Sequence, residues 1–245
     1  KPLLLLVMLA AGVIGGGLWA LIPGILKTRF NCSESITTLM LNYVALGWIK
    51  YLQYGPWKDP KAMGMPKMPL FEDNAVLPNV FGVHIGWLIA LVLVLVVYIF
   101  MNYSKKGFEI AILGESEDTA RYAGVNIRRT MLLAVFLSGA LSGLAGAIQA
   151  SAVNTQLSVG LANGIGYTAI ITAWLSGLSA PVIVLVCILF ATLTQGGSYI
   201  QTVFGIPAAA AQILQALILF FVLGSNFFTR YKIVRKTAGK KEEVA

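Results

Sequence analysis

Residues 88–100 read LIALVLVLVVYIF, an unbroken apolar run without a charged side chain. With its flanking residues the run extends over His84–Tyr103, close to the about 20 residues that a helix needs to cross the core of a bilayer. Backbone N–H and C=O groups in lipid must be paired within the segment or in a closed barrel. Because a barrel would show short alternating strands and this run is continuous, it predicts a membrane-spanning helix.

The whole chain has the same character. It contains 245 residues, of which 58% are hydrophobic and 11% charged, whereas soluble domains contain about 25% charged residues. A soluble core of this size cannot hide so much apolar surface. We therefore predict an all-α, polytopic transmembrane helix bundle with about seven membrane segments: Leu3–Leu26, Ile36–Gln53, His84–Tyr103, Met131–Ala152, Gly164–Ser179, Pro181–Gly197 and Pro207–Phe228.

The fifth of these segments is unusually short. Gly164, Gly166 and Gly177 interrupt it, and Pro181 follows at once. Short, broken helices occur where transport paths form. Two alternatives remain open from the sequence: a half-crossing helix, or a tight hairpin of two ordinary spans.

Basic residues set the orientation, because Lys and Arg are enriched in cytoplasmic loops. The predicted segments place 13 of the 18 basic residues on one side and 5 on the other. The first side, which holds the C-terminus, is therefore predicted to be cytoplasmic. Topology also accounts for the net charge of +8, so we expect no nucleic acid partner.

Small residues recur four apart in two of the segments. Gly12 and Gly16 lie in the first segment, and Gly139 and Gly143 in the fourth. Helices in lipid associate through close backbone contact at such positions. Both segments are therefore predicted to lie inside the bundle.

The sequence contains few groups suited to catalysis. It has no phosphate-binding G-x-x-x-x-G-K-[ST] loop, and its only histidine is His84 at the end of a span. Cys32 and Cys187 are interpreted as free thiols. No ionisable residue lies deep in a predicted span, where proton-coupled carriers often place one. We expect no catalytic residue, metal or cofactor, and a transport subunit rather than an enzyme.

The most informative polar segment is GESEDTARYAGVNIRR, residues 114–129. Glu117 and Arg121 form a helix-favouring i,i+4 pair, Ser116 is placed to cap a short helix, and Gly124 is placed just after its end. We therefore predict a short charged helix at the membrane surface. The alternative is a solvated loop without a partner.

This segment resembles the coupling loop of a permease family in ATP-binding cassette (ABC) importers of branched-chain amino acids, ribose-type sugars and nucleosides. The pattern G-E-x-x-x-x-A-R-Y-A-G-V-N carries the resemblance. Residues 18–20, 27–30, 38–43 and 55–60 are similar to the nucleoside and simple-sugar branch. The likeness covers nearly the whole chain, and complete members carry further helices before the point where this sequence begins. We therefore expect a single transmembrane permease domain, residues 1–245, that lacks those N-terminal helices.

The resemblance implies a division of labour in a bacterial cytoplasmic membrane. A cytoplasmic ABC ATPase subunit would bind the short helix, an extracytoplasmic binding protein would deliver a small polar solute, and a second permease chain, identical or different, would complete the pore. The residues expected to couple to the ATPase are Glu115, Glu117, Asp118, Arg121, Tyr122 and Gly124.

Uncharged amides inside spans are the candidate solute contacts, because they both donate and accept hydrogen bonds and so suit nucleosides. The alternative role for each is an interhelical hydrogen bond. Asn42 is the preferred candidate because it also matches the branch motif. The full set is Asn42, Gln149, Asn154, Gln195, Gln201, Gln212 and Gln215. The predicted function is a nucleoside permease; the alternatives are a simple-sugar permease and a secondary carrier or channel without ATP coupling.

Overall fold

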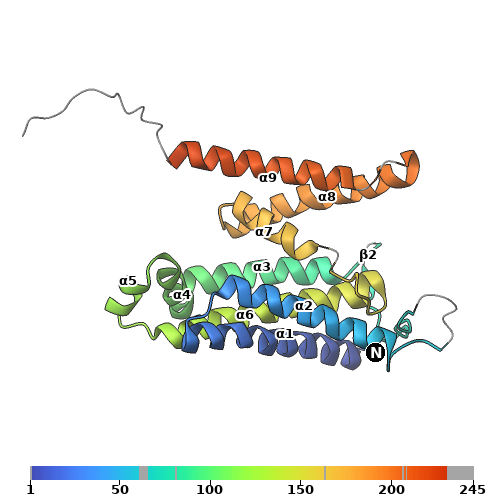
Figure 1. Ribbon diagram of the computed structural model, residues 1–245, viewed down its shortest axis with the longest axis horizontal. Helices are drawn as coiled ribbons and strands as arrows, with labels where there is room; N and C mark the ends of the chain where they lie inside the picture. The colour runs from blue at the N-terminus through green and yellow to red at the C-terminus, as the bar shows by residue number, and fades with distance from the viewer. Residues whose placement is uncertain are drawn as a thin grey trace, which may run out of the picture. The chain divides into compact units, whose positions relative to one another are not determined.

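Figure 1 shows the computed structural model, which describes residues 2–60, 66–80, 82–162, 164–205, 207 and 209–230. The chain divides into two compact units, residues 1–163 and 164–245. Most described residues are helical, which confirms the helical class. The described strands are the residue pairs β1 (Asn79–Val80) and β2 (Val83–His84), which pair antiparallel. Among the basic residues that set the predicted orientation, those outside the described residues are Lys1, Lys61, Lys232, Arg235, Lys236, Lys240 and Lys241.

The first unit holds most of the helices. In chain order they are α1 (Pro2–Phe30), α2 (Glu34–Tyr54), α3 (Gly86–Tyr103), α4 (Lys105–Glu115), α5 (Glu117–Tyr122), α6 (Ile127–Ile148) and the π-helix η1 (Gln149–Asn154). The second unit contains α7 (Ile165–Leu175), α8 (Ala180–Phe204) and α9 (Ala209–Arg230).

Four helices among the described residues are long and apolar enough to cross a membrane: Leu3–Phe30, Gly86–Tyr103, Ile127–Asn154 and Ala180–Phe204. The expected number of about seven spans is therefore not confirmed. Helix α2 is long enough, but Asn42, Lys50 and Gln53 lower its apolar character. The four helices bury only 6% of their most apolar windows, so their apolar side chains face outward and require an apolar solvent.

Helix α7 occupies the short fifth segment. Its 11 residues correspond to a length of about 16 Å at 1.5 Å per residue, about half the hydrocarbon core. A turn through Gly177, with φ of +59°, leads into α8, which has Pro181 in its first turn. Of the two alternatives for this segment, the geometry favours the half-crossing helix.

Helices α1 and α6 pack closely along their length, in antiparallel directions (Figure 1). A Cβ atom added to Gly16 would lie 2.7 Å from the Cα atom of Gly143, and one added to Gly143 would clash with the carbonyl oxygen of Gly12. Neither site has room for a side chain. The small residues predicted to hold spans together therefore lie at the contact between α1 and α6.

The two ends of the first unit are built differently. At one end, the last part of α1 meets the start of α6, where Gly24 faces Leu132 and Val135. Helices α4 and α5 lie at this end of the unit (Figure 1). At the opposite end, segment 66–80 contacts η1 and the residue after it: Leu77 N donates to Ser151 O at 3.3 Å, and Phe71 N donates to Thr155 O at 2.8 Å. The segments assigned to the two membrane sides are thus separated within this unit.

Candidate functional site

The short helix predicted between the third and fourth spans is present as α5, and it begins at a capped end. The hydroxyl oxygen of Ser116 accepts a hydrogen bond from the backbone N–H of Thr119 at 3.3 Å. This cap satisfies a donor that the first turn of a helix leaves unpaired. Glu117 and Asp118 lie in that turn, where negative charge is favourable. The predicted cap at Ser116 is confirmed.

The end of α5 is fixed by a Schellman motif. Val125 N donates to Ala120 O at 3.0 Å, and Gly124 N donates to Arg121 O at 3.1 Å. Gly124 has a φ of +73°, in the left-handed region that glycine adopts at little cost. The predicted role of Gly124 after the helix end is confirmed, and the local geometry of α5 is set at both ends.

Helix α5 buries its one small apolar side chain and exposes its charged ones. Ala120 is fully buried, whereas Tyr122 is 94% exposed. The predicted pair is present, with Arg121 Nη2 3.6 Å from Glu117 Oε1. Because both side chains are mostly exposed, the pair adds little stability and remains accessible to a partner. All the predicted coupling residues are exposed: Glu115, which ends α4, and Glu117, Asp118, Arg121, Tyr122 and Gly124.

A buried carboxylate lies in α4, the helix that precedes α5, and it is not among the residues predicted from the sequence. Glu109 of α4 is 9% exposed. Its Oε2 atom lies 2.7 Å from Lys106 Nζ and 3.4 Å from the hydroxyl oxygen of Thr130 in α6. The hydrogen bond from Lys106 lowers the pKa of Glu109 from its ordinary value. The signal available in the sequence was an i,i+3 Lys–Glu spacing beside an apolar run.

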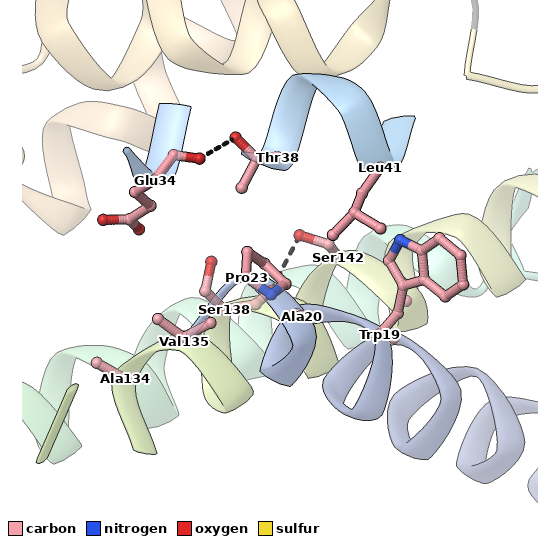
Figure 2. A pocket seen from close by; sticks show the side chains of 13 residues that line it. Trp19, Ala20, Pro23, Glu34, Thr38, Leu41, Ala134, Val135, Ser138 and Ser142 are labelled. Atoms are coloured by element: carbon pink, nitrogen blue, oxygen red, sulfur yellow. Dashed lines mark hydrogen bonds between the residues drawn. The ribbon is translucent and has the colours of Figure 1, made fainter. Parts of the chain in front are cut away.

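A groove lies between α1, α2 and α6, and Figure 2 shows it from close by. It forms because α2 stands away from the α1–α6 pair and has no buried residue. Its volume is about 630 Å³, within the about 300–1,000 Å³ of small-molecule sites. The lining residues are Gly16, Trp19, Ala20, Pro23, Glu34, Thr38, Leu41, Ala134, Val135, Ser138, Gly139, Ser142 and Gly143.

Polar groups reach the groove from all three helices. Ser138 and Ser142 lie one turn apart on α6, and the Ser142 hydroxyl donates to Ser138 O at 2.9 Å. Glu34 and Thr38 lie one turn apart on α2. On α1, Pro23 lacks an N–H, so the carbonyl of Trp19 cannot receive its usual hydrogen bond from residue 23. The groove therefore combines hydroxyls, a carboxylate and an indole.

Three of the amides predicted to contact solute belong to this first unit. Asn42 does not line the groove, but it lies one helical turn beyond Thr38 on the same face of α2. Gln149 is the first residue of η1, seven positions after Ser142 of α6. Neither Asn42 nor Gln149 lines the groove, although helical spacing places each in line with residues that do, and Asn154 is the last residue of η1.

The remaining amides belong to the second unit. Gln195 and Gln201 are exposed on α8. Gln212 is exposed on α9, three residues before Gln215, so the two positions share a helix face.

The described residues contain no group of three or more His, Cys, Asp or Glu side chains arranged to hold a metal ion. Cys32 and Cys187 are free thiols there. The groups that the structure does assemble are an exposed charged helix, a buried carboxylate in the helix before it and a groove with mixed polar lining.

Comparison with known proteins identifies the class to which these features belong. Residues 2–223 match the family described as the permease component of branched-chain amino acid transport systems. The chain belongs to this family of membrane permeases. The resemblance noted on residues 114–126 is therefore confirmed over most of the sequence.

Several relatives are ABC transporter permeases. A glucose ABC transporter permease of Haloferax volcanii is 35% identical over 94% of this chain and 64% of its own length. A guanosine ABC transporter permease of Bacillus subtilis is 33% identical over 91% of this chain and 65% of its own length. A nucleoside ABC transporter permease of Lactococcus lactis is 30% identical over 90% of this chain and 64% of its own length. The chain thus spans less than two thirds of each relative. No solved structure matches.

Proposed function

We propose that this chain is the membrane-spanning part of an ABC importer that moves nucleosides across a bacterial cytoplasmic membrane. A separate ATPase subunit drives it, an extracytoplasmic protein delivers the solute, and a second permease chain pairs with it. Hydrolysis of ATP takes place in the partner, so this chain supplies the path and the coupling surface. Its C-terminus is on the cytoplasmic side.

The observation that carries this proposal is the geometry of α5. The helix is held at both ends by its own caps, so its shape does not depend on a partner. It presents Arg121, Glu117 and the 94%-exposed Tyr122 outward. A preformed helix with a charged and aromatic face binds at lower entropic cost than a flexible loop. These properties suit docking into a groove of the ATPase.

The side chains that line the groove between α1, α2 and α6 are suited to bind a polar, uncharged solute. Ser138, Ser142 and Thr38 offer hydroxyls, and Glu34 accepts hydrogen bonds from the hydroxyls of a ribose. The Trp19 ring offers an apolar face for a base. A simple sugar is the second candidate solute, since the relative from Haloferax volcanii is a glucose permease.

Uptake of radiolabelled uridine and adenosine by cells that express the full-length gene with its neighbouring ATPase and binding-protein genes tests the choice of solute. Unlabelled guanosine is expected to block this uptake, and ribose, glucose and a branched-chain amino acid are expected to leave it unchanged. Inhibition by glucose or ribose would instead assign the permease to the sugar branch.

Asn42 provides a test of the solute path. Replacing it with leucine removes a donor and an acceptor one turn beyond Thr38, so the KM for the solute is expected to rise about tenfold. Asn102→Leu, on the exposed end of α3, is the matched control and should leave KM unchanged. A loss of protein stability without a change in KM would make Asn42 a structural residue.

A further inference from the structure

Helix α5 packs mainly against two neighbouring helices of the first unit. Its six residues pack against α4 and against the start of α6. A force applied to α5 by a partner therefore passes into these two helices. Whether α4 and α6 move together depends on what joins them to each other.

Glu109 and Thr130 join them. The Glu109 side chain comes from α4 and is nearly buried, while Thr130 lies in the first turn of α6 and is 2% exposed. The Thr130 hydroxyl donates to Glu109 Oε2 at 3.4 Å, and Lys106 Nζ supplies the opposite charge at 2.7 Å. A buried carboxylate is costly unless it is paired in this way. The arrangement of α4 and α6 in which Glu109 keeps both Lys106 and Thr130 as partners is therefore favoured.

The ends of α4 and α6 are also fixed locally. Ser104 accepts from Gly107 N at 2.9 Å, and a Cβ atom on Gly107 would lie 2.7 Å from Met101 Cα. Asn126 caps α6 by accepting from Arg129 N at 3.1 Å. The helices thus have defined starting points, and the contact between Glu109 and Thr130 sets how one lies on the other.

Motion of α6 extends to the groove. Helix α6 packs on α1 through glycines that leave no space between their backbones, so the two helices form one wall of the groove and α2 forms the other. A displacement of α6 at its α4 end would shift this wall relative to α2.

We propose that Glu109 is a positioning residue that ties α4, and with it the coupling helix α5, to α6 through Thr130. It makes the α1–α6 wall follow the coupling helix when the ATPase acts. This inference rests on the proposed function and adds the route by which the coupling helix acts on the groove.

The test measures solute transported per ATP hydrolysed. Proteoliposomes contain the full-length permease, its ATPase and the loaded binding protein, with uridine and glucose as labelled probes. Glu109→Ala is expected to lower transport per ATP about tenfold while ATP hydrolysis stays within about twofold of wild type. Thr130→Val, which keeps the side-chain shape, is expected to lower it about threefold.

A double-mutant cycle separates the contact from general destabilisation. Because both changes break one link, Glu109→Ala with Thr130→Val should be no worse than Glu109→Ala alone. Glu109→Gln, which fills the same volume and keeps an acceptor for Thr130, should retain more transport per ATP than Glu109→Ala. Phe108→Ala, at an adjacent position that is 63% exposed, is the matched control and should behave as wild type.

Wild-type transport per ATP in Glu109→Ala would overturn the inference. Equal losses of ATP hydrolysis and transport would also overturn it, since they indicate a damaged complex rather than uncoupling. A wild-type complex that moves neither probe in an ATP-dependent manner would contradict the proposed function itself, and this inference would fall with it.

Discussion

Replacing Gly143 with valine is expected to prevent α1 and α6 from packing, and to give the largest loss of stability of any change considered. A Cβ atom at this position meets the Gly12 carbonyl oxygen and lies 2.9 Å from Gly16 Cα. Both contacts are with backbone, which cannot rotate away as a side chain does. Overpacking of this kind costs about 3 kcal/mol at the upper end. Steric trapping of the purified protein in bilayer discs measures the free energy of unfolding.

Gly146 provides the control on the same helix, because a Cβ atom there meets no atom within 4 Å. Gly146→Val is expected to change the free energy of unfolding by less than about 1 kcal/mol. The pair Gly16→Ala and Gly15→Ala repeats the comparison on α1, since the space beside Gly15 is open and that beside Gly16 is filled. Equal stabilities of Gly143→Val and Gly146→Val would show that the glycine contact does not hold the two helices together.

Replacing Gly124 with valine is expected to reduce solute uptake about tenfold or more while the protein still inserts into the membrane. The φ of +73° is strongly unfavourable for a β-branched residue, so the end of α5 would unwind and its exposed face would lose its shape. Gly124→Asn is the matched control, because asparagine tolerates the left-handed region, and uptake should largely remain. The same low uptake in both variants would mean that backbone conformation is not the cause.

Reversing the charge at Arg121 tests the same helix by another route. Arg121→Glu removes the pair with Glu117 and changes the exposed face, so uptake is expected to fall by a similar factor. Glu117→Arg combined with Arg121→Glu restores an ion pair within α5, but the charges at positions 117 and 121 stay reversed relative to the wild type. If the charges contact a partner, uptake stays low in the double variant. Full recovery would show that the pair acts only within the helix.

The features that the sequence predicts well are local or depend on spacing alone. The Ser116 cap and the Gly124 end of α5 involve residues a few positions apart, so their chemistry can be read without the tertiary fold. Gly12 with Gly16, and Gly139 with Gly143, mark close packing because a side chain at any of them would separate the helices. The structure adds that these two sets face each other.

Other features depend on how distant elements meet. Glu109 and Thr130 are 21 residues apart, and neither position alone indicates a buried contact. The groove exists because α2 stands off from α1 and α6, which no pattern within α2 encodes. Ser138 and Ser142 line the groove, although their sequence spacing alone does not distinguish them from residues that only pack between helices. The amides chosen as solute contacts remain predictions, and neither Asn42 nor Gln149 lines the groove.

The dependence of transport on ATP tests the central claim most directly. Solute uptake would be measured in proteoliposomes that contain the full-length permease, its ATPase and the loaded binding protein, with ATP either supplied on the ATPase side of the membrane or left out. A second preparation would carry an ATPase whose phosphate-loop lysine is replaced. We expect uptake only with ATP and the active ATPase. Equal uptake without a working ATPase would contradict the account and assign the chain to the secondary carriers or channels.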